Sequence, residues 1–222
     1  MAAAGRRYYP IFLDVAARRV AVIGGGRVAE RKVRQLLACG ARVTVISPAL
    51  TPRLRAWRRR KKIFWKSRGY RRGDLDRMWL VVAATDQSPV NRTVSIEAAR
   101  RKVWVNVVDD PARSSAIAPA WFRRGPLVVA FSTGGASPAL ARQLRLKLSR
   151  EIGRDYAAYV AFLARVRHEV HRRVRDAATR QKLMRRLVRA NLLPLLKRGK
   201  LGELRRQIAR LTSSSPARGG GG

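Results

Sequence analysis

The sequence predicts an α/β fold with a parallel sheet, followed by a strand hairpin and a small all-helical domain. Short β-branched runs alternate with helix-like segments through the first half of the chain, and several of these runs are apolar on both faces. The second half is almost wholly helical in its residue pattern. Strands that are apolar on both faces and separated by helices are typical of a parallel sheet covered by helices.

Five strands and three helices are expected in the first half of the chain. The strands are expected at 19–23, 42–46, 63–65, 80–84 and 103–108. The helices are expected at 28–39, 51–60 and 90–100. Gly40 follows the first helix as a stop signal, and Pro52 lies in the first turn of the second, where proline is well tolerated.

The pattern changes after Pro111. Two runs at 116–122 and 127–132 flank residues 123–126 and predict an antiparallel hairpin. Ser137 then provides an N-cap and Pro138 a first helical residue. Further helices are expected at 139–151, 155–174, 177–190 and 199–211, with Gly153, Pro194 and Gly199 as breakers. We therefore divide the chain into 1–113 (nucleotide-binding domain), 114–150 (hairpin plus helix), 151–211 (helical domain) and 212–222 (disordered tail).

Composition excludes several classes of protein. The chain has 222 residues, of which 46% are hydrophobic, so it can bury a core despite a net charge of +37. A single cysteine, Cys39, excludes a disulfide framework and any site that needs several cysteines. No apolar run approaches the ~18 residues of a membrane span, and the N-terminus lacks the layout of a signal peptide. These features predict a soluble, cytoplasmic protein without a membrane partner.

The basic charge favours polyanionic partners such as nucleic acid, an anionic membrane, or a small substrate dense in carboxylates or phosphates. Residues 1–112 hold 25 basic and 8 acidic residues, and residues 113–222 hold 25 and 5. This even spread favours ordinary solvated surface charge over a dedicated nucleic-acid site. A surface of this kind could still bind polyanions without specificity. The run 58–62 is the best local candidate for a phosphate-binding patch. The alternative is a basic run that closes a surface helix.

The motif Gly24-Gly25-Gly26-x-x-Ala29 follows the first strand and opens a helix, which is the context that a Rossmann dinucleotide site requires. Gly24 allows the tight turn, Gly26 lets the backbone approach a pyrophosphate, and Ala29 lets helix and strand pack closely. An acidic residue is expected at the end of the second strand, but Ser47 stands there. Arg27 or Arg42 could favour a 2′-phosphate, so the choice between NAD and NADP stays open.

Asn106 and Asp109 lie at the end of the fifth expected strand, where open α/β sheets bind ligands. A carboxylate there could act as a general base, with a pKa set by burial and by surrounding arginines. The alternative is that Asp109 or Asp110 only caps the turn before Pro111.

Five motifs in order resemble the precorrin-2 dehydrogenase family, which also includes sirohydrochlorin ferrochelatases and part of sirohaem synthases. They are 10–12, 22–32, 83–86, 106–109 and 132–138. The resemblance implies NAD-dependent conversion of precorrin-2 to sirohydrochlorin, a homodimer formed through the segment 114–150, and, in some members, insertion of ferrous iron as a substrate. Some members carry a fused methyltransferase, for which this chain leaves no room, so no methylation is expected.

The resemblance also implies roles for individual residues. Asp109 takes the position of the catalytic aspartate, and Asn106 and Thr133 that of substrate contacts. The cofactor contacts are Gly24, Gly25, Gly26, Arg27, Val28, Ser47, Pro48, Ala49 and Thr85. Precorrin-2 carries eight carboxylates, and Arg113, Arg142 or Arg145 could bind them or be ordinary surface charges. No metal ligands can be named, because His168 and His171 are better interpreted as surface residues.

Two other functions remain open at this point. One is a non-enzymatic nucleic-acid-binding protein that keeps a Rossmann scaffold, which the charge favours and the lack of a known nucleic-acid module opposes. The other is a metabolite sensor that binds NAD without turnover. Reduction of NAD by precorrin-2 would distinguish the enzyme from both.

Overall fold

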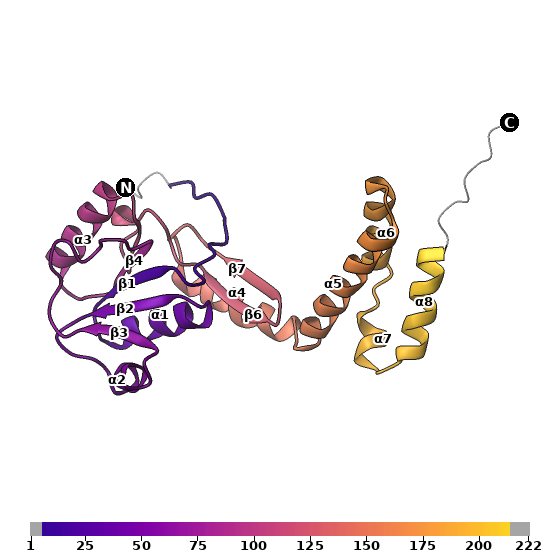
Figure 1. Ribbon diagram of the computed structural model, residues 1–222, viewed down its shortest axis with the longest axis horizontal. Coiled ribbons are helices and arrows are strands. Elements are labelled where there is room, and N and C mark those ends of the chain that lie inside the picture. Colours follow the sequence, from indigo (N-terminus) through magenta and orange to yellow (C-terminus); the bar gives the residue numbers. More distant parts are fainter. Residues whose placement is uncertain (1–5, 214–222) are drawn as a thin grey trace. The chain divides into compact units, whose positions relative to one another are not determined.

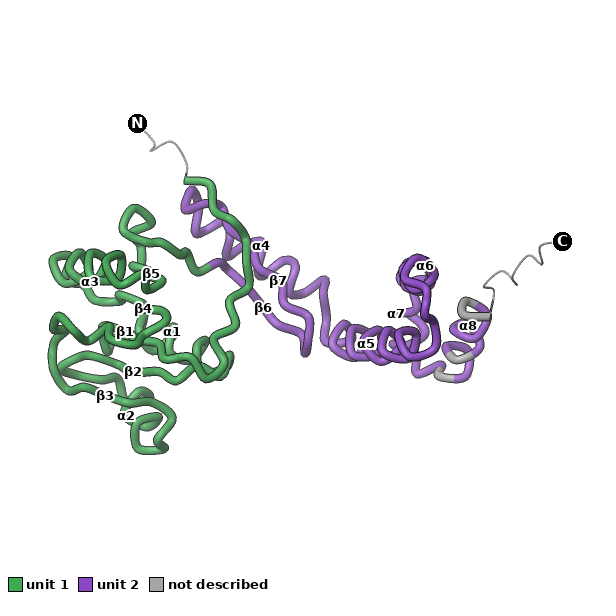
Figure 2. Tube along the Cα trace, turned by 45° about the horizontal axis from the view of Figure 1, so that its top comes forward, with its two compact units in different colours: residues 1–118 green, residues 119–222 purple. Residues whose placement is uncertain are grey.

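The computed structural model describes residues 6–213. The chain divides into two compact units, the first ending at Ala118 and the second starting at Pro119 (Figure 2). The first unit contains a five-stranded parallel sheet in the order β3-β2-β1-β4-β5 (Figure 2; the first four of these are also labelled in Figure 1). Its strands are β1 (Arg19–Ile23), β2 (Arg42–Ile46), β3 (Ile63–Lys66), β4 (Leu80–Ala83) and β5 (Trp104–Val107). The predicted α/β class with a parallel sheet is confirmed.

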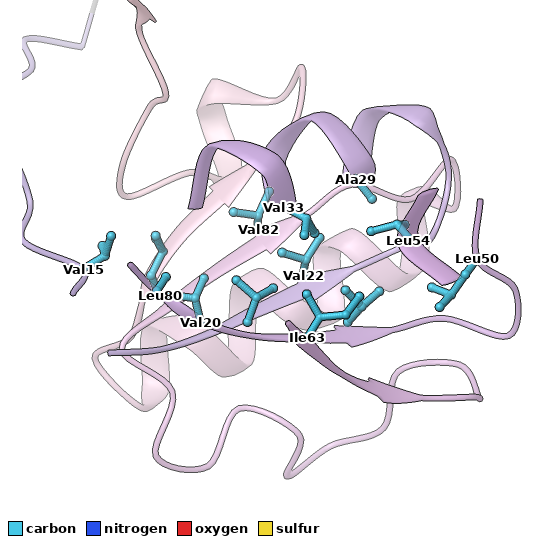
Figure 3. Close-up of a cluster of buried hydrophobic side chains, with 13 residues drawn as sticks. Val15, Val20, Val22, Ala29, Val33, Leu50, Leu54, Ile63, Leu80 and Val82 are labelled. Atoms are coloured by element: carbon cyan, nitrogen blue, oxygen red, sulfur yellow. The ribbon is translucent and has the colours of Figure 1, made fainter. Parts of the chain in front are cut away.

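Helices cover both faces of this sheet, as the apolar strands predict. One core cluster joins β1 and β2 to α1 (Arg27–Ala38) and α2 (Pro52–Arg59) through residues such as Val22, Val33 and Leu54 (Figure 3). The opposite face packs against α3 (Ser88–Arg100) through Val94 and Ala98. Cys39 is partly buried and packs against the first cluster.

The order of the strands places the switch point of the sheet between β1 and β4. β1 pairs with β2 on one side and with β4 on the other, so the chain reverses direction across the sheet after β3. In open α/β sheets, ligands bind at this switch point, beyond the carboxyl ends of the strands. The glycine motif and residues 108–110 both follow the carboxyl ends of strands in this sheet, and Asn106 lies in β5, directly before its last residue.

The loop between β3 and β4 is held by one buried carboxylate, Asp74. Its oxygens accept hydrogen bonds from Lys66 Nζ (2.7 Å), from both terminal nitrogens of Arg68 (2.7 and 2.8 Å) and from the Arg71 N–H (2.9 Å). Burial by itself raises the pKa of Asp74, but these hydrogen bonds outweigh it and hold the pKa well below its usual 3.8.

The chain after η1 (Pro111–Arg113) covers the open edge of β5. The Ser115 and Ala116 N–H groups donate to the Val105 carbonyl, at 2.9 and 3.0 Å. The expected strand at 116–122 was therefore wrong in its start, because these residues satisfy the edge of β5 and the hairpin begins only at Ala120. Strands β6 (Ala120–Arg124) and β7 (Leu127–Phe131) are joined by the two residues Gly125 and Pro126.

The second unit contains this antiparallel hairpin and five helices within the described residues. They are α4 (Pro138–Glu151), α5 (Asp155–Arg173), α6 (Ala177–Arg189), α7 (Leu193–Lys197) and α8 (Leu201–Ser213). Ser137 caps α4 by accepting the Leu140 N–H at 3.2 Å, as predicted. The Arg124 side chain donates to the carbonyls of Ser149 (2.6 Å) and Ile152 (3.1 Å), which closes the other end of α4.

Helix α7 was not predicted, because Pro194 was interpreted as a breaker. Pro194 lies in the first turn of this short helix, where the missing N–H has no intrahelical partner to lose. Leu187, Leu192 and Leu204 form the buried centre of the helical core. Thr212 and Ser213, expected in the tail, belong to α8, and residues 214–222 lie outside the described part. Over residues 6–213, no helix is both long enough and apolar enough to cross a membrane.

Candidate dinucleotide and active site

Gly24 and Gly25 are required by the packing of the loop between β1 and α1. Gly24 has φ +115°, and a Cβ there would lie 2.4 Å from the carbonyl oxygen of Ala84. A Cβ on Gly25 would lie 1.9 Å from the carbonyl oxygen of Ala49. Both positions therefore exclude any side chain, because neighbouring backbone comes too close. The spacing of the motif had assigned no special role to Gly25.

Gly26, in contrast, is open to solvent. A Cβ added there would meet no atom within 4 Å, and its backbone (φ −82°, ψ −172°) suits any residue. Gly26 is the N-cap of α1 and offers no side chain to the free N–H groups of the first turn, which include those of the exposed Arg27 and Val28. Such a helix start is suited to an anion, since free N–H groups and the helix dipole both favour negative charge. Ala29 is fully buried, as close packing requires.

The segment after β2 supports the glycine loop from the side. Ser47 is only 8% exposed, and its carbonyl accepts the Trp65 indole N–H at 2.9 Å. Pro48 and Ala49 are exposed beside the loop. The Thr51 N–H donates to the Gly25 carbonyl (3.0 Å), so this segment and the loop are directly joined. Ser47 thus lies beneath the loop, and Pro48 and Ala49 present the accessible surface for a cofactor.

Thr85 lies next to Gly24 at the end of β4. Its hydroxyl hydrogen-bonds the side-chain oxygen of Asn91 (2.9 Å), and its carbonyl accepts from the Asn91 amide (3.0 Å). Its backbone nitrogen would be 3.4 Å from a Cβ on Gly24. Thr85 therefore fixes the start of α3 against the glycine loop.

The two carboxylates after β5 differ in what they contact. Asp110 caps η1 by accepting the Arg113 N–H (3.1 Å), and it also forms an ion pair with the Arg113 side chain. Asp109 is exposed, has φ +60°, and takes part in no hydrogen bond or ion pair with the side chains described between residues 6 and 213. The capping role belongs to Asp110, which leaves Asp109 available. The expected burial of Asp109 was wrong.

Lys32 is a residue that the sequence reasoning did not single out. It lies on α1, and its Nζ donates to the Asn106 Oδ1 at 3.4 Å, so it connects the glycine helix to the end of β5. Burial lowers the pKa of Lys32, the charge of Arg31 lowers it further, and the nearby Asp109 opposes these effects. The Asn106 amide in turn donates to the Ala116 carbonyl at 3.1 Å. Lys32, Asn106 and Asp109 therefore form one polar cluster.

The predicted substrate arginines lie in different surroundings. Arg113 is paired with Asp110 and lines a shallow cavity of about 440 Å³ between α3 and β5, together with Ser95 and Trp104. Thr133 and Arg142 belong to the second unit. The Thr133 hydroxyl accepts the Ser137 N–H at 3.0 Å, and Arg142 is exposed on α4.

No group of three metal-ligating side chains occurs among the described residues. His168 and His171 are both exposed on α5, and the His171 Nδ1 lies 2.9 Å from the Arg167 carbonyl oxygen. These observations agree with the interpretation of both histidines as surface residues.

The strand order, the glycine loop and the open start of α1 define a Rossmann-type dinucleotide-binding protein. Residues 11–120 match the family described as "Putative NAD(P)-binding", and residues 124–151 match the family described as "Sirohaem biosynthesis protein central". These two matches, one to an NAD(P)-binding domain and one to a central domain of sirohaem biosynthesis, agree with the family resemblance seen in the motifs of the chain.

Individual proteins show the same similarity. The chain is 44% identical over 186 residues to siroheme synthase 1 of Aeromonas salmonicida, covering 84% of this chain and 40% of that protein. It is 40% identical over 193 residues to the siroheme synthase of Thioalkalivibrio sulfidiphilus, covering 87% of this chain and 40% of that protein. The solved structure of SirC, precorrin-2 dehydrogenase, superposes with a TM-score of 0.74 at 28% identity, covering 91% of this chain and all of SirC. The chain thus spans about 40% of the length of these siroheme synthases.

Proposed function

We propose that the protein oxidises precorrin-2 to sirohydrochlorin with NAD as the hydride acceptor. The observation that carries this proposal is the polar cluster of Lys32, Asn106 and the unpaired Asp109, at the same sheet edge as the open glycine loop. The similarity to SirC supports the substrate, and the NAD(P)-binding family supports the cofactor. When bound, NAD supplies a carbon that accepts a hydride.

The residues of the chain would hold such a cofactor through backbone groups. The N–H groups at the start of α1 face open space beside Gly26 and fit a pyrophosphate. Pro48 and Ala49 offer exposed surface to the adenosine half. No carboxylate stands at the end of β2 to discriminate against a 2′-phosphate, so the assignment of NAD rests on the similarity to the precorrin-2 dehydrogenases.

Asp109 is the proposed general base. Dehydrogenation removes a hydride and a proton from the substrate, and the Asp109 carboxylate accepts the proton. Lys32 is the proposed positioning residue, because its ammonium group contacts Asn106 and attracts Asp109.

We take arginines as the main partners of the substrate carboxylates. In the second unit the candidates are the Arg142 guanidinium and, as a further polar contact, the Thr133 hydroxyl. Arg113 can bind a carboxylate only by giving up part of its contact with Asp110. A cytoplasmic homodimer completes the proposal. A chain with a single cysteine suits a reducing compartment. The net charge of +37 would attract the carboxylates of precorrin-2, and it would also attract other polyanions. Ferrous iron enters the proposal only as a second substrate.

An anaerobic assay with precorrin-2 and NAD tests this function. Absorbance at the NADH band and the appearance of sirohydrochlorin should rise together, and the Asp109→Asn variant should lose kcat by at least ~100-fold, the lower range for general-base loss. NAD binding should survive in that variant. Asp76→Asn removes the same charge from an exposed loop residue and serves as the control. Full activity in Asp109→Asn would refute the assignment of the base, and NAD binding without turnover in the wild type would favour a sensor. Addition of ferrous ion tests chelation in the same cuvette.

A further inference from the structure

The most basic part of the chain lies between Glu30 and Asp74. This stretch contains fifteen lysines and arginines and no aspartate or glutamate. Its densest part covers the end of α2 and the turn into β3. Six exposed cations lie there, namely Arg55, Arg58, Arg59, Arg60, Lys61 and Lys62. We call these six cations, together with Phe64, the α2–β3 patch.

The acidic residues that flank this stretch are already paired with other cations. Glu30 accepts the Thr51 hydroxyl at 2.7 Å and lies 3.7 Å from Arg53, and Asp74 binds Lys66 and Arg68. None of the six cations of the patch forms an ion pair with any carboxylate among residues 6–213. Favourable interaction with the helix dipole extends only over the last turn, so it explains Arg58 and Arg59 but not the whole run.

One cation of the patch is held in place by an aromatic ring. The Arg58 guanidinium lies 5.8 Å from the ring centre of Trp65, and the Trp65 indole is itself fixed by its hydrogen bond to the Ser47 carbonyl. Phe64, the residue before Trp65 on β3, leaves 70% of its surface in solvent. Within residues 6–213, β3 is an edge strand that pairs only with β2. Its neighbours Ile63 and Trp65 pack on the core beneath α2, so the Phe64 ring projects from the opposite face of the sheet. The basic run and the Phe64 ring therefore lie on the two sides of the β3 edge. A single strand that passes over this edge can place its phosphates on the cations and stack a base on the ring.

We propose that the α2–β3 patch binds single-stranded nucleic acid, with the six cations on phosphates and Phe64 stacked on a base. This surface is separate from the proposed cofactor site, because it lies where β3 begins, whereas the glycine loop and Asp109 follow the carboxyl ends of parallel strands. An anionic membrane fits less well. Between Val28 and Ile96, Phe64 is the one large apolar side chain that the described structure exposes, and a membrane-bound surface needs an apolar face.

A net charge of +37 attracts any polyanion, so the test compares variants of equal charge. The patch variant is R58Q/R59Q/R60Q/K61Q/K62Q. The control variant removes five exposed cations of the helical unit, none of which forms an ion pair with a described carboxylate, as R165Q/R167Q/R175Q/K182Q/R189Q. A second pair of variants changes no charge: Phe64→Ala, and Phe12→Ala at a ring of similar exposure. Thermal unfolding and NAD binding show that each variant is folded.

The readout is fluorescence anisotropy of a labelled oligouridine of about 15 nucleotides, the upper range of a single-strand site, titrated at several salt concentrations. The patch variant should bind at least tenfold more weakly, and its slope of log K against log salt should fall by about 0.7 for each lost phosphate contact. Phe64→Ala should weaken binding about tenfold, as the loss of one stacked base does. The control variant and Phe12→Ala should change affinity less than threefold.

Two results would overturn the proposal. Equal losses in the patch and control variants would show that binding depends on net charge alone. Phe64-dependent binding to phosphatidylglycerol vesicles, without Phe64-dependent binding of the oligonucleotide, would assign the surface to a membrane instead.

Discussion

Replacement of Gly26 by alanine separates the binding of the cofactor from the stability of the loop. The structure gives Gly26 an ordinary backbone conformation and no atom within 4 Å of an added Cβ. The only folding cost is that of alanine at an N-cap, about 0.5–1 kcal/mol. The added methyl group, however, occupies the space in which a pyrophosphate must approach the start of α1. Affinity for NAD should therefore fall at least tenfold, or about 1.4 kcal/mol.

The measurement combines calorimetric titration with NAD and urea unfolding with and without NAD. At a concentration of 100 times the wild-type Kd, NAD should stabilise the wild type by about 2.7 kcal/mol and a tenfold weaker variant by only about 1.4 kcal/mol. Gly25→Ala is the contrasting variant. Its Cβ would start 1.9 Å from the Ala49 carbonyl oxygen, so the backbone must move and the loop itself should lose 1–3 kcal/mol or more, an ordinary range for overpacking.

If Gly26→Ala binds NAD as tightly as the wild type, no anion lies at the start of α1 and the inferred geometry of the cofactor site is refuted. If Gly25→Ala is as stable as the wild type, the contact between the loop and residues 47–51 does not restrict that position.

Three further substitutions test other parts of the first unit. Lys32→Met should lower kcat/KM about tenfold and shift its pH profile, whereas Lys182→Met on α6 should change neither, and an unmoved profile would remove Lys32 from the mechanism. Asp74→Asn should cost about 2–3 kcal/mol at pH 7 in urea unfolding, since it leaves Lys66 and Arg68 without their carboxylate. Because the folded pKa of Asp74 is lowered, its stabilisation is complete above the ordinary value of 3.8 and is lost as the pH falls below it, so a difference undiminished at pH 3 would contradict the assignment. Ser114→Ala should lower the free energy of unfolding by about 1–2 kcal/mol and reduce turnover. The Ser114 hydroxyl accepts the Val107 N–H (2.9 Å) and donates to the Asp110 carbonyl (2.8 Å), so it holds the turn that carries Asp109. Unchanged turnover would show that this turn needs no such support.

Features that depend on neighbours in sequence were predictable. The runs that form β1 and β2 show their burial in their own residues, and they occupy the predicted ranges 19–23 and 42–46. Gly24, Gly26 and Ala29 follow from the spacing of one motif, and their surroundings agree with the roles assigned to them. The family was also evident from motifs, because five short segments in a fixed order leave little room for coincidence.

Features that depend on distant segments were not predictable. Gly25 is restricted by the carbonyl of Ala49, and Lys32 gains its place in the site through Asn106. Each of these partners comes from a different strand end, so no local pattern announces it. The late start of β6 has the same origin, since Ala116 is already bound to β5. Lys32 could have been noticed only as a lysine one turn from the start of a dinucleotide-binding helix.

The backbone of Asp109 decides which substitution tests its charge. At φ +60° most side chains are strained, whereas aspartate and asparagine tolerate this region. Asp109→Ala would therefore move the turn as well as remove the carboxylate, and lost activity would have two explanations. Asp109→Asn keeps both the shape and the conformational preference, so only the charge changes. A large loss in Asp109→Asn with unchanged stability would thus identify the carboxylate itself, and not the turn, as the group that acts on the substrate.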